Sequence, residues 1–201
     1  MSSAIDFYFD FASPYGYFAS TRIDELAGRY GRDVEWHPIL LGVVFKTTGS
    51  QPLPQVPMKG EYALHDFKRT ARHHGIAYQQ PDAFPIPTQA AARAMLWVQS
   101  KVGDDRAIEF AKALFKAYFV DNQNIGDPDV VAAVATAMGL NGDALADGIN
   151  SASVKDQLRA ETDLAMAKGV FGSPYVIIDG EAFWGFDRFD QVEALLKNGH
   201  I

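Results

Sequence analysis

The first forty residues alternate between patterns typical of strands and of helices. Apolar side chains at every second position of residues 5–11 indicate a β-strand. Ser13-Pro14 follows, a pair suited to the first positions of a helix, and apolar residues recur at helical spacing over residues 15–30, until Gly31. A second β-rich run covers residues 34–41. The opening therefore predicts a strand–helix–strand unit with a right-handed parallel crossover.

The middle of the chain has a different pattern. Residues 42–60 are rich in glycine, proline and threonine, and we expect a long loop there. Residues 61–168 show helical spacing throughout, with start and stop signals such as Asp127-Pro128 and Gly139. This stretch predicts a group of helices.

Strand patterns return near the end. Two apolar runs, at residues 174–178 and 181–184, flank Asp179-Gly180, which is a strong signal for a β-hairpin. Residues 187–197 then predict a last helix.

This order of elements predicts an α/β protein with a thioredoxin-like fold and a large all-helical insertion. We expect residues 1–60 and 169–201 to form the thioredoxin-like domain and residues 61–168 to form the insertion.

Charge and cysteine content narrow the function. The 201 residues carry 18 Lys and Arg against 25 Asp and Glu, a formal net charge of −7, which disfavours nucleic acid as a partner. The chain contains no cysteine, so disulfides, thiolate metal ligands and cysteine nucleophiles are excluded.

Targeting and metal signals are absent from the sequence. The first residues resemble no signal peptide and no apolar run is long enough to span a bilayer, so we expect a cytoplasmic protein without membrane contact. His65, His73 and His74 do not follow the spacing of metal ligands, and we expect no metal site; His37, in a strand, is interpreted as structural.

Ser13 is the first candidate for chemistry. It lies between the carboxyl end of a strand and the amino end of a helix, where open α/β sheets bind ligands and where a thiolate is stabilised. The alternative is that Ser13 only caps the helix, and its position alone favours that interpretation.

Two later segments are candidates as well. Ser173-Pro174 precedes the hairpin; a cis bond there would turn the backbone of Ser173 towards a cleft, although trans is the more common form. Asp187 and Arg188 follow the hairpin and offer charges for an ammonium and a carboxylate group, or act as a helix cap and a solvated side chain.

A fourth group lies at the start of the helical region. Tyr62, Asp66 and Arg69 share one face of a predicted helix, with Lys59 just before it. Without other information an exposed ion-pair face is the preferred interpretation.

Four segments resemble, in order, the signatures of 2-hydroxychromene-2-carboxylate isomerases and kappa-class glutathione transferases. They are Phe-Asp-Phe-Ala-Ser-Pro-Tyr-Gly-Tyr at 9–17, Pro-Met-Lys-Gly-Glu-Tyr-Ala-Leu-His-Asp at 57–66, Val-Phe-Gly-Ser-Pro at 170–174 and Trp-Gly-Phe-Asp-Arg at 184–188. Each motif is weak alone, but four in register are fairly specific.

The resemblance implies a DsbA-like fold, a homodimer and the use of glutathione. It implies that Ser13 hydrogen-bonds the glutathione sulfur and holds it as a thiolate, replacing the first cysteine of a Cys-x-x-Cys motif. It further implies that Ser173, before a cis Pro174, pairs its backbone with the cysteinyl unit of glutathione.

Other positions follow from the same resemblance. Asp187 and Arg188 would bind the γ-glutamyl end and Lys59 would lie near the cleft. Ser50 stands where the family often has an asparagine that helps to order thiol and substrate. The chain also departs from the family pattern at Pro87, in place of asparagine, and at Phe186, in place of a polar residue.

The resemblance implies isomerisation of a 2-hydroxychromene-2-carboxylate-like aromatic compound through bound glutathione, in the breakdown of aromatic compounds. Glutathione transfer or peroxide reduction, as in the kappa class, is the first alternative. A redox-inactive thioredoxin-like binding module is the second.

Overall fold

The computed structural model describes residues 4–201 and is built on a four-stranded mixed sheet. The strands are β1 (Ile5–Phe9), β2 (Val34–Pro38), β3 (Tyr175–Ile178) and β4 (Glu181–Trp184), in the order β2-β1-β3-β4. β1 runs parallel to β2 and antiparallel to β3, and β3 pairs with β4 in an antiparallel hairpin. The predicted strand–helix–strand opening and the late hairpin are confirmed.

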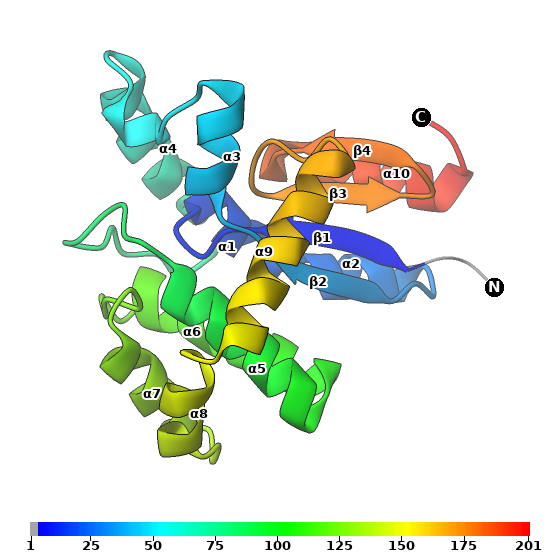
Figure 1. Cartoon of the computed structure of the whole chain (residues 1–201). Coiled ribbons are helices and arrows are strands. Elements are labelled where there is room, and N and C mark those ends of the chain that lie inside the picture. The colour runs from blue at the N-terminus through cyan, green and yellow to red at the C-terminus, as the bar shows by residue number, and fades with distance from the viewer. Residues whose placement is uncertain (1–3) are drawn as a thin grey trace.

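Helices cover the sheet and form most of the middle of the chain. They are α1 (Pro14–Ser20), α2 (Ile23–Arg29), α3 (Leu41–Thr48), α4 (Lys59–His74), α5 (Gln89–Val102), α6 (Asp104–Phe119), α7 (Pro128–Ala137), α8 (Gly142–Gly148), α9 (Ala152–Ala167) and α10 (Phe189–Asn198), with 3-10 turns at Leu53–Gln55 and Phe186–Arg188. Figure 1 shows α9 crossing in front of the sheet and α2 and α10 behind it. In the part of the chain described, no helix combines the length and apolar character needed to cross a membrane.

The first predicted helix is divided into α1 and α2. The Thr21 hydroxyl donates to the Phe18 carbonyl over 2.7 Å, and the backbone N–H groups of Thr21 and Arg22 bond three residues back, to Phe18 and Ala19. Such tight bonds close a helix. A spacing pattern that continues across the break does not reveal it.

The long loop predicted over residues 42–60 is wrong in its first half, because α3 occupies residues 41–48. The N–H of Leu41, its first residue, donates to the Asp10 carboxylate over 2.7 Å, and Val44 is buried. The capping group therefore comes from a residue 31 positions away in the chain. No local signal for a helix start was present.

The predicted helical stretch is also interrupted. Residues 75–88 form no helix, and Pro81, Pro85 and Pro87 fall in this segment, where proline removes N–H donors and clashes with the preceding turn. The Phe84-Pro85 bond is cis. The segment is fixed to α6 by a hydrogen bond of 2.7 Å from the Gln79 N–H to the Phe119 carbonyl.

One hydrophobic core joins the sheet to the helices of the middle region. The rings of Phe9 and Phe11 lie 5.5 and 4.9 Å from that of Phe115 on α6, and Tyr17 on α1 stacks on Phe119 at 5.3 Å. All five side chains are buried. The start of α1, which carries Ser13, is thus held by aromatic packing on α6.

Candidate functional site

Ser13 caps α1 and is 8% exposed. Its backbone is extended, and its Oγ accepts the Gly16 N–H over 3.0 Å, as an N-cap does. The same hydroxyl donates its proton to the backbone carbonyl of Ser173 over 3.0 Å. Ser13 is therefore a cap and also a contact to the segment before β3.

The sheet register brings Ser173 to Ser13. β3 pairs with β1 so that Tyr175 lies opposite Tyr8, and continuing this register by two residues places Ser173 opposite Asp10. The Asp10 N–H donates to Ser173 Oγ over 3.0 Å, and the Ser173-Pro174 bond is cis. Two candidates 160 positions apart in sequence thus meet at the carboxyl end of β1.

Gly16 allows this close approach. A Cβ at this position would lie 2.7 Å from Ser173 Oγ and 3.2 Å from Ser13 Cβ. The first contact is shorter than a real Cβ tolerates and the second is tight, so any larger residue would have to displace the Ser173 side chain.

We expect Gly16→Ala to lower the free energy of unfolding by about 1–3 kcal/mol, because the new methyl group displaces the Ser173 side chain. Thermal or denaturant unfolding measures the change. Gly28→Ala is the control: Gly28 lies in α2 with open space around its Cβ position. There alanine is expected to stabilise by about 0.5–1 kcal/mol, and equal effects at the two positions would contradict the close contact.

Asp10 is buried, and its carboxylate holds the turn before Ser13 by hydrogen bonds. One carboxylate oxygen accepts the Ala12 N–H and the Thr88 hydroxyl, each over 2.8 Å, and the other accepts the Leu41 N–H. Burial raises the pKa of this carboxyl, and the three donors oppose that rise. Asp10 therefore joins the Ser13 turn to the starts of α3 and α5.

The sequence did not single out Asp10. Asp10 alternates with apolar residues at the end of a strand, which is the pattern of an ordinary solvent-facing polar residue. Its sequence signals are a carboxylate three residues before Ser13-Pro14 and its place in the motif at 9–17, and neither assigns it a role. Its partners Leu41 and Thr88 are distant in sequence, and neither could be predicted.

Asp187 and Arg188 are attached to the same region through Gly185. The Gly185 N–H donates to the Pro174 carbonyl over 3.0 Å, and its φ of +109° favours glycine. Phe186, which the family pattern predicts as polar, is buried against Phe18 of α1. These two contacts anchor the turn. The side chains of Asp187 and Arg188 stay exposed, at 73% and 48%, and the Asp187 carboxylate lies 3.6 Å from the Arg188 guanidinium.

Ser50 lies on the segment joining α3 to α4, and Lys59 is the first residue of α4; both are exposed. Figure 1 shows α3 and α4 on the side of the sheet where β1 leads into α1. Within residues 4–201, neither side chain forms a hydrogen bond or an ion pair with the other five candidates.

The face carrying Tyr62, Asp66 and Arg69 forms the network expected of it. Arg69 donates to Asp66 over 2.9 Å through Nε and to the Tyr62 hydroxyl over 2.7 Å. Asp66 also accepts the hydroxyl of Tyr15, the second residue of α1. Burial and the hydrogen bond to Asp66 raise the pKa of Tyr15. This face therefore fixes α4 to the helix that Ser13 begins.

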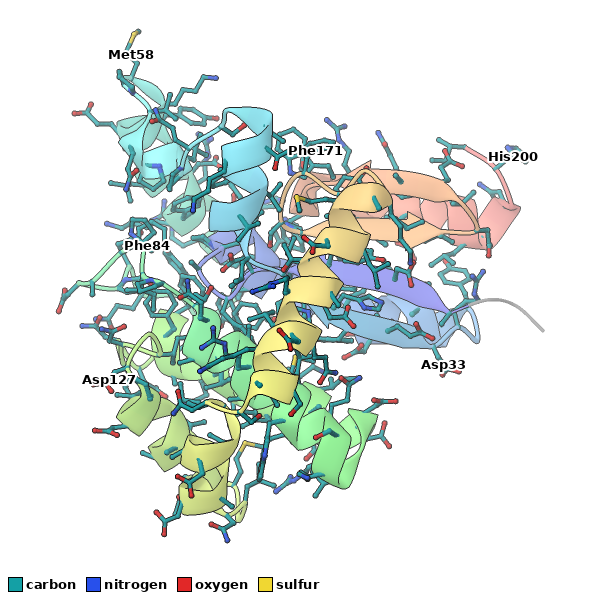
Figure 2. All side chains as sticks on the ribbon, viewed as in Figure 1. Asp33, Met58, Phe84, Asp127, Phe171 and His200 are labelled. Atoms are coloured by element: carbon teal, nitrogen blue, oxygen red, sulfur yellow. The ribbon has the colours of Figure 1, made fainter. Side chains whose placement is uncertain are left out.

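Aromatic side chains lie exposed beside Ser173. Phe171, labelled in Figure 2 where α9 leads into β3, is 43% exposed, and Trp184 of β4 is 56% exposed. Their rings meet edge to face with centroids 4.9 Å apart, and Phe171 also contacts Tyr175. They offer flat apolar surface beside the segment that carries Ser173.

Two surface hollows lie elsewhere. One of about 330 Å³ is lined by Tyr17, Thr21 and Lys112, among others, and one of about 550 Å³ by residues that include Lys68, Arg72 and Tyr78. Neither is lined by any of the seven site candidates.

Comparison with known proteins supports the resemblance seen in the sequence. The profile of the DSBA-like thioredoxin domain family matches residues 4–197. A 2-hydroxychromene-2-carboxylate isomerase of Sphingobium xenophagum is 29% identical over 198 residues, which cover 98% of this chain and 99% of that protein. Glutathione S-transferase kappa 2 of Caenorhabditis elegans is 28% identical over 204 residues, which cover 96% and 91%.

A solved structure gives the same result for the fold. The structure of a 2-hydroxychromene-2-carboxylate isomerase superposes on this chain with a TM-score of 0.87 at 24% identity. The superposition covers 96% of this chain and 94% of the isomerase chain. The predicted DsbA-like fold and the resemblance to these two groups of proteins are confirmed.

Proposed function

The chain belongs to the family of DSBA-like thioredoxin domains, and from this we propose that it is a glutathione-dependent isomerase of 2-hydroxychromene-2-carboxylate-like compounds. The observation that carries the proposal is the hydrogen bond between Ser13 and the Ser173 backbone, in a chain without cysteine. A hydroxyl stands where a redox thioredoxin would hold a thiol. We propose glutathione as the source of the missing sulfur.

The residues present fit glutathione. The Ser13 hydroxyl has one proton, which it donates to the Ser173 carbonyl. A peptide N–H of the incoming glutathione can take the place of the Ser13 hydroxyl as donor to the Ser173 carbonyl. The Ser13 hydroxyl is then free to donate to a sulfur anion. Every polar group would remain paired after this exchange, as a buried site requires.

Bound glutathione would supply a thiolate nucleophile for reversible addition to a conjugated enone, whose carbonyl would take up the electron pair of the double bond and return it on elimination. The Ser13 hydroxyl donates a hydrogen bond to the sulfur and so stabilises the thiolate. Phe171 and Trp184 offer apolar faces to an aromatic substrate. Asp187 and Arg188 are proposed to take the amino and carboxylate groups of the γ-glutamyl end, with Lys59 and Ser50 near the cleft. We further propose a cytoplasmic homodimer.

Incubation with glutathione and 2-hydroxychromene-2-carboxylate tests the proposal. We expect the absorption spectrum of the substrate to change while the concentration of free thiol stays constant. The similarity to the kappa 2 protein favours glutathione transfer as a second candidate, and loss of thiol in step with substrate would support it instead. If titration with millimolar glutathione gave no heat and no shift in melting temperature, a binding module would be favoured.

Arg188→Ala is expected to raise the KM for glutathione about tenfold with kcat little changed, because a charge-assisted contact to the distant end of the ligand is lost. Steady-state kinetics at varied glutathione concentration measure this. Arg29→Ala is the matched control, since Arg29 is similarly exposed and paired with Glu193. If the KM for glutathione were unchanged in Arg188→Ala, Arg188 would not be a glutathione-binding residue.

A further inference from the structure

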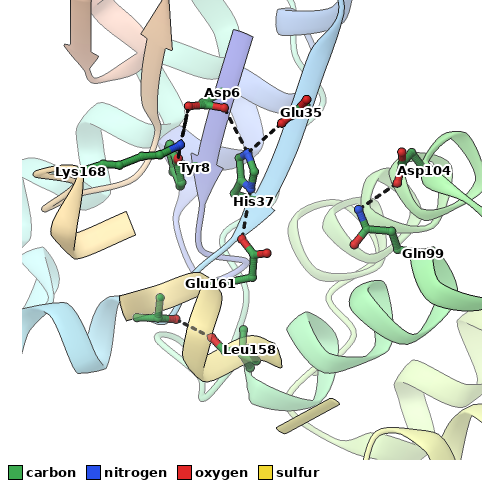
Figure 3. A network of polar contacts seen from close by, with 10 residues as sticks. Asp6, Tyr8, Glu35, His37, Gln99, Asp104, Leu158, Glu161 and Lys168 are labelled. Carbon is green, nitrogen blue, oxygen red and sulfur yellow. Dashed lines mark hydrogen bonds and ion pairs between the residues drawn. The ribbon is translucent and has the colours of Figure 1, made fainter. Parts of the chain in front are cut away.

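A polar cluster lies on the sheet face beneath α9, away from Ser13. Figure 3 shows His37 of β2 between Asp6 of β1, Glu35 of β2 and Glu161 of α9. The parallel register of β1 and β2 produces it, since Asp6 pairs with Glu35 and Tyr8 with His37. Asp6 lies near the start of β1, whereas Ser13 follows its carboxyl end.

Glu161 determines which nitrogen of His37 carries the proton in the neutral ring. His37 Nδ1 lies 3.2 Å from Glu161 Oε2. A carboxylate only accepts hydrogen bonds, so Nδ1 donates and the lone pair of a neutral imidazole is on Nε2. A histidine held this way through Nδ1 presents Nε2 as a metal ligand does.

That lone pair faces two further acceptors. Nε2 lies 3.4 Å from Asp6 Oδ1 and 3.9 Å from Glu35 Oε2. It is shielded from solvent and, among the residues described, has no hydrogen-bond partner. Three acceptor atoms within 4.8 Å of one another are unfavourable unless a cation lies among them.

We propose that Asp6, Glu35 and His37 bind a divalent cation of the zinc type. The three ligand atoms lie within 4.8 Å of one another. Metal–ligand bonds of about 2.1 Å in a tetrahedron set neighbouring ligand atoms about 3.4 Å apart. His37 Nε2 lies 3.4 and 3.9 Å from the two carboxylate oxygens. An imidazole with two carboxylates is a donor set that zinc accepts, and water would complete the coordination.

The surrounding charges match a divalent ion. Lys168 Nζ donates to Asp6 Oδ2 over 2.9 Å and to the Tyr8 hydroxyl over 2.8 Å. Lys168 therefore binds Oδ2 of Asp6 and leaves Oδ1, which lies 3.4 Å from His37 Nε2, without the ammonium. The three carboxylates and this one ammonium leave a local excess of two negative charges. Bound metal would neutralise it and would connect β1 and β2, with α9 held through Glu161.

Isothermal titration of the metal-free full-length protein with zinc chloride tests the site. We expect one zinc ion to bind per chain and chelator to reverse it. His37→Gln and, separately, Glu35→Gln should each lower the affinity at least tenfold. The Glu35 side chain is 64% exposed, so its replacement is expected to leave the fold intact. Glu161→Gln should weaken binding about tenfold through the orientation of His37.

His65→Gln is the control, because His65 is an exposed histidine on α4. It should bind zinc as the wild type does. If the wild type binds no zinc, the proposal is wrong. It is equally wrong if both His37→Gln and Glu35→Gln retain full affinity, since zinc then binds elsewhere. Neither result bears on glutathione turnover.

Discussion

Ser13→Ala is expected to lower kcat/KM for glutathione-dependent turnover about 100-fold, the usual effect of removing one hydrogen-bond donor to a developing anion. The variant also loses its cap, at a cost of about 1 kcal/mol in the free energy of unfolding. Steady-state kinetics combined with thermal unfolding separate the two effects. The fold should survive, because the aromatic packing on α6 holds α1 independently of the cap.

Ser151→Ala is the matched control. Ser151 caps α9, accepts the Val154 N–H over 3.4 Å and donates to the Gly148 carbonyl over 2.7 Å, so it makes the same two kinds of bond as Ser13. Its replacement should cost similar stability and leave kcat/KM unchanged. If Ser13→Ala lost no more activity than Ser151→Ala, Ser13 would be a cap alone.

Asp10→Ala is expected to lower the free energy of unfolding by about 3–5 kcal/mol. Three donors, the N–H groups of Ala12 and Leu41 and the hydroxyl of Thr88, would lose their acceptor in a buried position. The loss reaches the Ser13 turn and the starts of α3 and α5 together. Denaturant unfolding measures it, with activity expected to fall because the Ser13 turn loses its support.

Two variants show whether the effect comes from this network. Asp127→Ala removes an exposed carboxylate that caps α7 through the Asp129 N–H, and should cost about 1 kcal/mol. Thr88→Val removes a single donor to Asp10 and should cost about 1–2 kcal/mol. A loss in Asp10→Ala no larger than in Asp127→Ala would contradict the network.

The sequence predicted the elements whose signals are local. The hairpin around Asp179-Gly180 and the helix that begins after Asp127 contain their own turn or capping residues, and both are present. α3 was missed because its capping carboxylate belongs to Asp10. The proline-rich segment at 75–88 falls within the predicted helical stretch because the helical patterns on either side of it are strong.

The same distinction between local signals and distant contacts separates the site residues that the sequence predicted from those that it did not. Ser13 and Ser173 were predicted from motifs that match the family in register, and the strand register brings them into contact. Asp10 lies within the first of those motifs, but its role and that of the group around His37 depend on contacts between distant segments, which the motifs do not show. The parallel register of β1 and β2, which pairs Asp6 with Glu35, appears only in the folded chain.

The acidity of the glutathione thiol in the complex tests the central claim most directly. The ultraviolet absorbance of the thiolate, followed against pH with glutathione bound, gives the pKa of the thiol. In the wild type we expect it about one unit or more below the ordinary thiol value of about 8.5, and in Ser13→Ala close to that value. Equal pKa values in the two proteins would contradict the role of the Ser13 hydroxyl in holding a sulfur anion.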